Sequence, residues 1–299
     1  MNPAILQADK NEVCDFLLKK LSSALTTDKY SDLKYMLDEL RSKQSAAALH
    51  MAFSKVVRLF GKTEIVYTAL EIKEADAIRK CWQPPLSIDK AFRILLLFEL
   101  PLNNEVAFLN SYETLFSAAD LGENVALYAA LPLLPYPEKL LKRCEEGIRT
   151  NMGEVFESVA NNNPYPAEYL SEDAFNQMVL KCVFIGKPLY RITNLQHRLN
   201  EKLAGMVSDY AHERWAASRA LSPEIWQLLQ PFLNENNLAD IKRLAASENA
   251  TEKQAAALVC YKSSLPAAIE ISTLLNLNKN IDSGVLSWRT LGEHVWQNQ

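Results

Sequence analysis

Glycine scarcity is the feature that most restricts what this chain can fold into. Only 8 of the 299 residues are glycine, less than half the average usage of about 7%. Tight two-residue hairpins and phosphate-cradling loops depend on glycine, because it adopts positive φ at no steric cost. Leucine and alanine, which are strong helix formers, are abundant instead. The sequence therefore disfavours Rossmann, P-loop and β-barrel folds and favours an all-α protein.

The spacing of apolar residues supports the same fold class. Val13, Phe16, Leu17 and Leu21 recur at intervals of three and four, the period of one helix face, and no stretch sustains strict alternation. The pattern predicts roughly 13–15 helices joined by short connections.

Two helix starts can be placed from residue type alone. Ser87 precedes an apolar run over 88–100 that Pro101 ends, so we expect it to cap a helix there. Ser222, Pro223 and Glu224 form a second start, with a capping residue, a proline in the first helical position and an acid near the N-terminus.

The domain organisation follows from length and the lack of linkers. A chain of this length can form one large domain, and no low-complexity tract divides it. We expect a single helical domain over 1–299, with a soft subdivision into 1–160 and 161–299. Small-residue helices, such as the one containing Ala46–Leu49, allow close helix approach. The predicted architecture is an α-α superhelix of HEAT-like repeats or an irregular multi-helix bundle.

Charge and cysteine usage limit the compartment and the partners. The net charge is −4 and the sequence pI is about 5.7, whereas nucleic-acid-binding domains are typically strongly basic. Five cysteines are widely separated without a C-x-x-C pair, and no apolar run approaches the length of a membrane span. We therefore expect a cytoplasmic protein with no visible secretory signal, no nucleic-acid partner and no direct membrane insertion.

The segment 161–226 carries the candidate site. It opens with Asn163-Pro164-Tyr165-Pro166, in which two prolines restrict the backbone. Ser171 then begins a helix that is apolar nearly all round over 174–185, which is typical of a buried helix. Its polar exceptions, which would need partners if buried, are Asn176, Gln177 and Lys181.

A second helix, predicted over 197–219, supplies candidate partners. Its apolar stripe is predicted to consist of Leu199, Leu203, Met206 and Tyr210. Another face carries Asp209, His212 and Glu213, with Arg214 beside it. A contact between Lys181 and Asp209 or Glu213 would place a carboxylate, an imidazole and a lysine together. Such a cluster serves either acid–base chemistry and ligand binding or a purely structural clamp between two helices.

Recognisable metal and nucleophile motifs are incomplete. His212-Glu213 begins like H-E-x-x-H, but position 216 is alanine, so the second zinc ligand is missing. A single carboxylate-x-x-His step over 209–212 falls short of a di-iron bundle, and no G-x-S-x-G occurs. The sequence predicts no catalytic triad, no metal and no cofactor.

Two sequence blocks resemble the EboA family, which belongs to a bacterial gene cluster. They are 163–181 (NPYPAEYLSEDAFNQMVLK) and 209–226 (DYAHERWAASRALSPEIW). The resemblance implies a part in the synthesis, trafficking or export of a secondary metabolite, together with other proteins of that cluster. It assigns no catalytic residue. The residues of the two blocks are therefore motif positions of the family, without assigned chemical roles.

The leading hypothesis is a non-enzymatic cytoplasmic protein that binds the metabolite or partner proteins of its cluster. The alternative is a metal-independent lyase, isomerase or hydrolase that acts on an isoprenoid or aromatic substrate through Lys181, Asp209, His212 and Glu213. The candidate ligand-binding or structural cluster comprises Asn163, Tyr165, Asn176, Gln177, Lys181, Asp209, His212, Glu213 and Arg214.

Overall fold

The protein is all-helical. A computed structural model describes residues 8–43 and 45–297, and within these ranges it contains seventeen α-helices, six short 3-10 helices and no strand. The predicted fold class is therefore confirmed. The helix count exceeds the prediction partly because α10 (Tyr165–Tyr169) and α16 (Asn278–Asp282) are too short to show a period.

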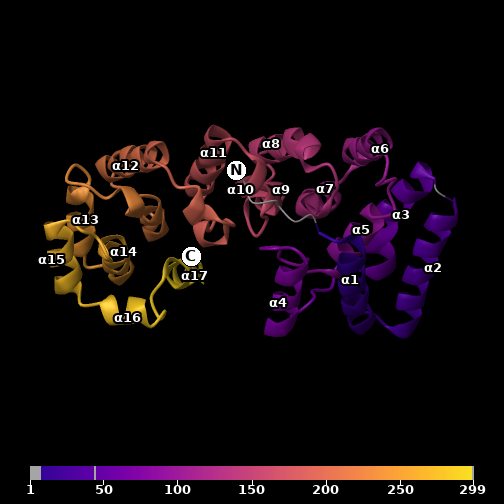
Figure 1. Ribbon diagram of the computed structural model, residues 1–299, viewed down its shortest axis with the longest axis horizontal. Coiled ribbons are helices and arrows are strands. Elements are labelled where there is room, and N and C mark those ends of the chain that lie inside the picture. The colour runs from indigo at the N-terminus through magenta and orange to yellow at the C-terminus, as the bar shows by residue number, and fades with distance from the viewer. Residues whose placement is uncertain (1–7, 44, 298–299) are drawn as a thin grey trace. The chain divides into compact units, whose positions relative to one another are not determined.

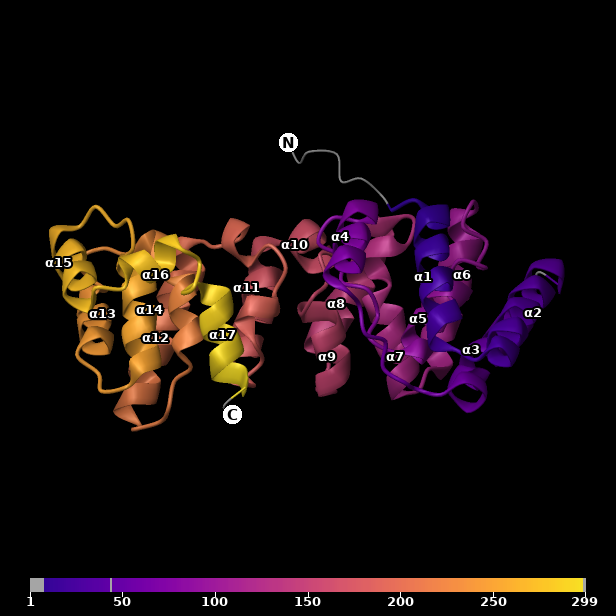
Figure 2. The ribbon, with the colours of Figure 1, turned by 90° about the horizontal axis from the view of Figure 1, so that it is seen from below.

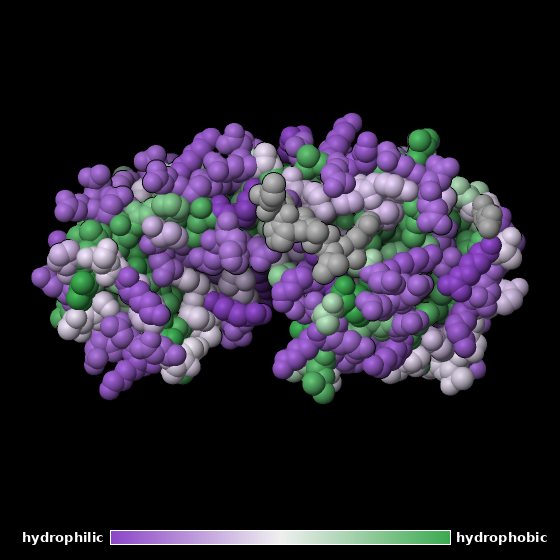
Figure 3. All heavy atoms as spheres, in the orientation of Figure 1, coloured by the Kyte–Doolittle hydropathy of each residue, from purple (hydrophilic) through white to green (hydrophobic). Residues whose placement is uncertain are grey.

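The chain forms two compact units, 1–170 and 171–299. The first unit runs from indigo to magenta in Figure 1 and the second from rose to yellow. On the face drawn in Figure 3, hydrophilic side chains surround smaller apolar areas on both units.

The first unit is built around α5 (Ile88–Leu97), which packs against α1 (Lys10–Ala24), α3 (Ala46–Phe60) and α7 (Leu121–Ala129). Nine of the ten residues of α5 are buried, including Asp89 and Arg93. The predicted apolar stripe of α1 is confirmed, because Val13, Phe16, Leu17 and Leu21 are all buried. The remaining α-helices of this unit are α2 (Thr27–Lys43), α4 (Ala69–Ile78), α6 (Glu105–Ala118), α8 (Leu141–Arg149), α9 (Gly153–Ala160) and α10.

The second unit is centred on α14 (Ala250–Cys260), which packs against α13 (Leu238–Ala245), α15 (Pro266–Leu275) and α17 (Trp288–Gln297). Figure 2 shows α13, α14 and α17 running alongside one another. The 3-10 helix η5 (Pro223–Leu228) is buried along its whole length between α14, α17 and α12 (Glu201–Ala216). Two further elements of this unit are α11 (Glu172–Phe184) and the 3-10 helix η3 (Leu189–Arg191).

Three local expectations need correction. Ser222 does begin a helical segment, but it is a 3-10 helix and the serine side chain makes no capping hydrogen bond. The helix expected over 197–219 begins at Glu201, because Asn200 caps it. Its buried stripe is Leu203, Ala204, Val207 and Ala211, whereas Met206 is 38% exposed.

Helix α11 begins as expected, since the Ser171 side chain accepts a hydrogen bond from the Ala174 backbone N–H at 3.2 Å. Burial along it is only partial. Phe175, Met178, Val179 and Cys182 are buried, but Phe184 and Ile185 at its C-terminal end are 59% and 44% exposed. The all-round apolar pattern therefore overestimated burial at the last turn, which borders a cavity.

Candidate functional site

The start of the first signature block closes a turn in the first unit. The Asn163 side-chain amide donates to the carbonyls of Tyr128 (3.2 Å) and Ser158 (3.0 Å), and its oxygen accepts from the Tyr165 backbone N–H at 3.0 Å. The Tyr165 hydroxyl donates to the Pro137 carbonyl at 2.5 Å. Since both side chains are buried and hydrogen-bonded, they hold the chain in place and offer nothing to a ligand.

Asn176 joins α11 to the start of α12. It exchanges two side-chain hydrogen bonds with Asn200, at 3.1 and 2.9 Å, and Asn200 in turn accepts from the Leu203 backbone N–H. Asn176 is 2% exposed, so its amide is satisfied within this pair. Gln177, its neighbour, is exposed.

Lys181 and the carboxylates of α12 occupy different environments. Lys181 is half-buried, and burial lowers its pKa, an effect that the neighbouring Cys182 opposes. Asp209 and Glu213 are exposed, and neither carboxylate is among the ion pairs described here for residues 8–43 and 45–297. Within these ranges, neither acid therefore forms the ion pair with Lys181 that the sequence suggested.

His212 instead pairs with a residue that the sequence did not indicate. Its Nε2 lies 2.8 Å from Oδ1 of Asp240 on α13, and the carboxylate is buried while the imidazole is exposed. Trp215 stacks on Trp226 nearby, and the Arg243 guanidinium lies 4.1 Å from the Trp215 ring centroid. His212 and Trp215 on this face of α12 therefore contact Asp240 and Arg243 of α13.

The second signature block borders a cavity of about 620 Å³ in the second unit, and the first block ends two residues before the lining begins at Val183. This volume falls within the 300–1,000 Å³ typical of ligand pockets. Its walls are formed by the end of α11, the second half of α12, the loop that follows α12, the start of α14 and the end of α17. Its lining residues are Val183, Phe184, Gly186, Tyr210, Arg214, Ala220, Leu221, Ser222, Pro223, Ile225, Asn249, Thr251, His294 and Val295.

Aromatic rings and one guanidinium define a wall of this cavity. The rings of Phe184 and Tyr210 are 4.9 Å apart at an interplanar angle of 50°. The Arg214 guanidinium lies 6.0 Å from the Tyr210 ring centroid, and its Nε and Nη2 donate to the Ala220 carbonyl at 3.1 and 2.7 Å. Of the nine residues in the predicted cluster, Arg214 is the one that lines the cavity.

A buried carboxyl group, Glu224, lies next to the cavity and was not predicted. It lines a narrow space that shares the residues Val183, Gly186, Ser222, Ile225 and Val295 with the cavity. Its carboxylate accepts backbone N–H groups of Leu189 (3.3 Å) and Tyr190 (3.0 Å). Burial nevertheless raises its pKa to about 7.

Sequence reasoning interpreted Glu224 only as a favourable acid at a helix start. Its burial depends on α17, where Gly292 approaches so closely that an added Cβ would overlap the Glu224 carboxyl and lie 2.5 Å from the Tyr190 ring. The available signal was a glycine inside a helix, a position that costs stability unless packing requires it.

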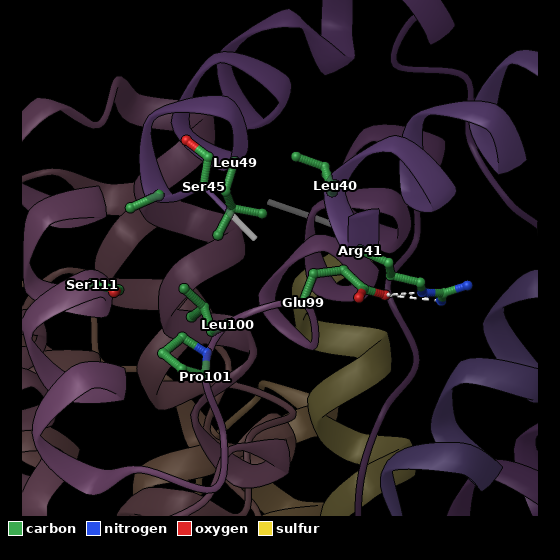
Figure 4. A pocket seen from close by; sticks show the side chains of 9 residues that line it. Leu40, Arg41, Ser45, Leu49, Glu99, Leu100, Pro101 and Ser111 are labelled. Atoms are coloured by element: carbon green, nitrogen blue, oxygen red, sulfur yellow. Dashed lines mark hydrogen bonds and ion pairs between the residues drawn. The ribbon is translucent and has the colours of Figure 1, made fainter. Parts of the chain in front are cut away.

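The first unit has its own cavity, of about 440 Å³ (Figure 4). Aliphatic side chains of Leu40, Leu49, Leu100 and Pro101 surround it, and Arg41 lies at its edge. Nε and Nη2 of Arg41 both donate to Glu99 Oε1, at 3.0 and 2.8 Å. Its cation is therefore already committed to a carboxylate.

Within residues 8–43 and 45–297, no three His, Cys, Asp or Glu side chains are grouped so that they could hold a metal ion. No helix of that part of the chain is both long enough and apolar enough to cross a membrane.

Comparison with known families gives one match. The family model described as "Metabolite traffic protein EboA" matches residues 13–230, which is more than two-thirds of the chain. No curated protein and no solved structure matches it. The matched region contains the cavity walls from α11, α12 and the loop that follows, whereas Asn249, Thr251, His294 and Val295 lie beyond it.

Proposed function

Because the chain belongs to the EboA family of metabolite traffic proteins, we propose that it binds a small-molecule metabolite in the cavity of the second unit and hands it on unchanged. The protein acts in the cytoplasm, where it serves the synthesis or export of a secondary metabolite together with other proteins of its gene cluster.

The cavity itself is the observation that carries this proposal. It has the volume of a ligand site, apolar, aromatic and polar side chains share its lining, and seven of its fourteen lining residues lie in the second signature block. Phe184 exposes an aromatic ring at its border. A large apolar side chain left exposed in this way is informative, because burial against a ligand would stabilise it.

The positions of the polar residues favour binding over catalysis. The enzymatic alternative requires Lys181, Asp209, His212 and Glu213 to act together. His212 is engaged by Asp240 on α13, and Asp209 and Glu213 are exposed. None of the four is among the residues that line the cavity.

Native mass spectrometry of the full chain, purified gently from its own cells with the gene cluster intact, tests the proposal. We expect a reproducible additional mass that disappears on denaturation. Ala220→Trp, which places an indole at a lining position, should reduce the occupied fraction strongly. Ala217→Trp is the matched control, because Ala217 is also exposed in the same turn but does not line the cavity.

Clean apo-protein, alone or with a co-purifying protein of the cluster, would contradict metabolite binding and favour a docking role. Equal loss of the bound mass in both tryptophan variants would place the ligand elsewhere.

A further inference from the structure

We propose that this cavity selects an anionic amphiphile, a ligand with an apolar ring-containing body and one negatively charged group that pairs with Arg214. The inference rests on the proposed function and specifies its ligand class.

The charges of the lining residues are one-sided. Arg214 is a permanent cation and His294 an imidazole, and none of the described residues that line the cavity carries a carboxylate. A neutral ligand would give the Arg214 guanidinium no charge partner, whereas an anion would pair with it. The lining therefore favours negative charge.

The hydrogen bonds of the wall leave one nitrogen of the Arg214 guanidinium available as a charged donor. Nε and Nη2 of Arg214 share the Ala220 carbonyl, and within the described residues its Nη1 has no hydrogen-bond acceptor. A carboxylate, sulfonate or phosphate oxygen supplies the acceptor that Nη1 lacks.

The nearest buried acid does not cancel this preference near neutral pH. Glu224 lies in the adjoining space, and its pKa of about 7, raised by burial, leaves it substantially protonated there. The apolar half of the site comes from Phe184, Tyr210, Leu221 and Ile225. Flat rings pack well against the two aromatic side chains, which accounts for the ring-containing body.

A matched pair of fluorescent probes tests the inference on the full-length protein. 8-Anilino-1-naphthalenesulfonate carries one negative charge, and N-phenyl-1-naphthylamine has nearly the same ring system without it. We expect the sulfonate to bind more tightly. Arg214→Gln should weaken sulfonate binding about tenfold, the order expected when a charge-assisted hydrogen bond is lost, and leave the neutral probe within about twofold.

Two further variants separate charge from structure. Arg219→Gln is the matched control, because Arg219 is exposed and does not line the cavity; it should change neither affinity. Arg214→Lys keeps the charge and should retain most of the sulfonate binding. If Arg214→Gln weakens both probes equally, or if the neutral probe binds wild-type protein as tightly as the sulfonate, the inference is wrong.

Failure of the proposed function has a different signature. If Ala220→Trp abolishes binding of both probes while Arg214→Gln does not discriminate between them, only the anion preference is overturned. If neither probe binds, or if Ala220→Trp leaves both affinities intact, the cavity is not the binding site and both proposals fall.

Discussion

The two units differ in how the arginine beside each cavity and the buried charged groups are partnered. In the first unit the buried arginines have carboxylate partners, Arg93 with Asp89 and Glu123 and Arg79 with Glu168, and the exposed Arg41 pairs with Glu99. In the second unit Arg214 contacts a carbonyl and a ring, and the buried Glu224 contacts backbone N–H groups.

The difference extends to the two cavities. The cavity of the first unit has an arginine at its edge that Glu99 neutralises, so a charged ligand would have to displace an existing partner. The cavity of the second unit presents an arginine without a carboxylate. Charges that are already paired hold a fold together, whereas an unneutralised cation beside a cavity is available for recognition.

Removing the buried cation of the first unit should have the largest effect. Arg93 is 1% exposed and donates to Asp89 at 3.0 Å, with Glu123 at 3.8 Å. Arg93→Met leaves two buried carboxylates without their cation, which should lower the free energy of unfolding by about 3–5 kcal/mol. Urea denaturation measures it, and Arg149→Met, at an exposed arginine, should cost less than about 0.5 kcal/mol. If both variants lower the free energy of unfolding by a similarly small amount, the proposed contrast between the two units is wrong.

The buried acid of the second unit should make stability depend on pH. The folded-state pKa of Glu224 is about 7, raised by burial from 4.5, so the folded protein holds this proton more tightly than the unfolded chain does. The contribution of Glu224 to stability is therefore greatest below pH 4.5, falls as pH rises towards 7 and is constant above it. The loss attributable to Glu224 is about 3 kcal/mol at 1.36 kcal/mol per pH unit.

Glu224→Gln removes this titration while keeping the side-chain shape. Urea denaturation at pH 5 and pH 8 should show a smaller stability difference in the variant than in the wild type, because other titrating groups contribute equally to both. An unchanged difference would mean that Glu224 ionises like a solvated carboxyl group.

The His212–Asp240 pair should have the smallest effect. The imidazole is exposed, so His212→Ala should lower the free energy of unfolding by only about 1 kcal/mol, chiefly by leaving the buried Asp240 without this partner. Because His212 does not line the cavity, binding of the naphthalenesulfonate probe should be unchanged. Loss of binding with stability intact would instead support a direct role for His212 and revive the enzymatic alternative.

The sequence predicted best what depends on neighbouring residues. The Val13, Phe16, Leu17 and Leu21 stripe is buried and Ser171 caps its helix, because both features are decided within one or two helical turns. The stripe of α12 was misplaced by one position, from Met206 to Val207. One residue is a rotation of about 100° around a helix, so a small error in choosing apolar positions selects the wrong face.

The partners of the polar residues could not be predicted in the same way. His212 contacts Asp240 on α13, and Glu224 is buried by a helix that contains Gly292. These contacts depend on how helices far apart in the sequence pack, and periodicity gives only the face of each helix, not its neighbour.

By itself, therefore, the sequence determined an all-α protein, several helix starts and the two blocks that mark the family, because propensity, period and capping act locally. The tertiary structure alone decided which carboxylates are neutralised, that Arg214 lines a cavity, and that Glu224 holds its proton near neutral pH. Burial and charge pairing depend on what surrounds a side chain in space, and those surroundings come from distant parts of the chain.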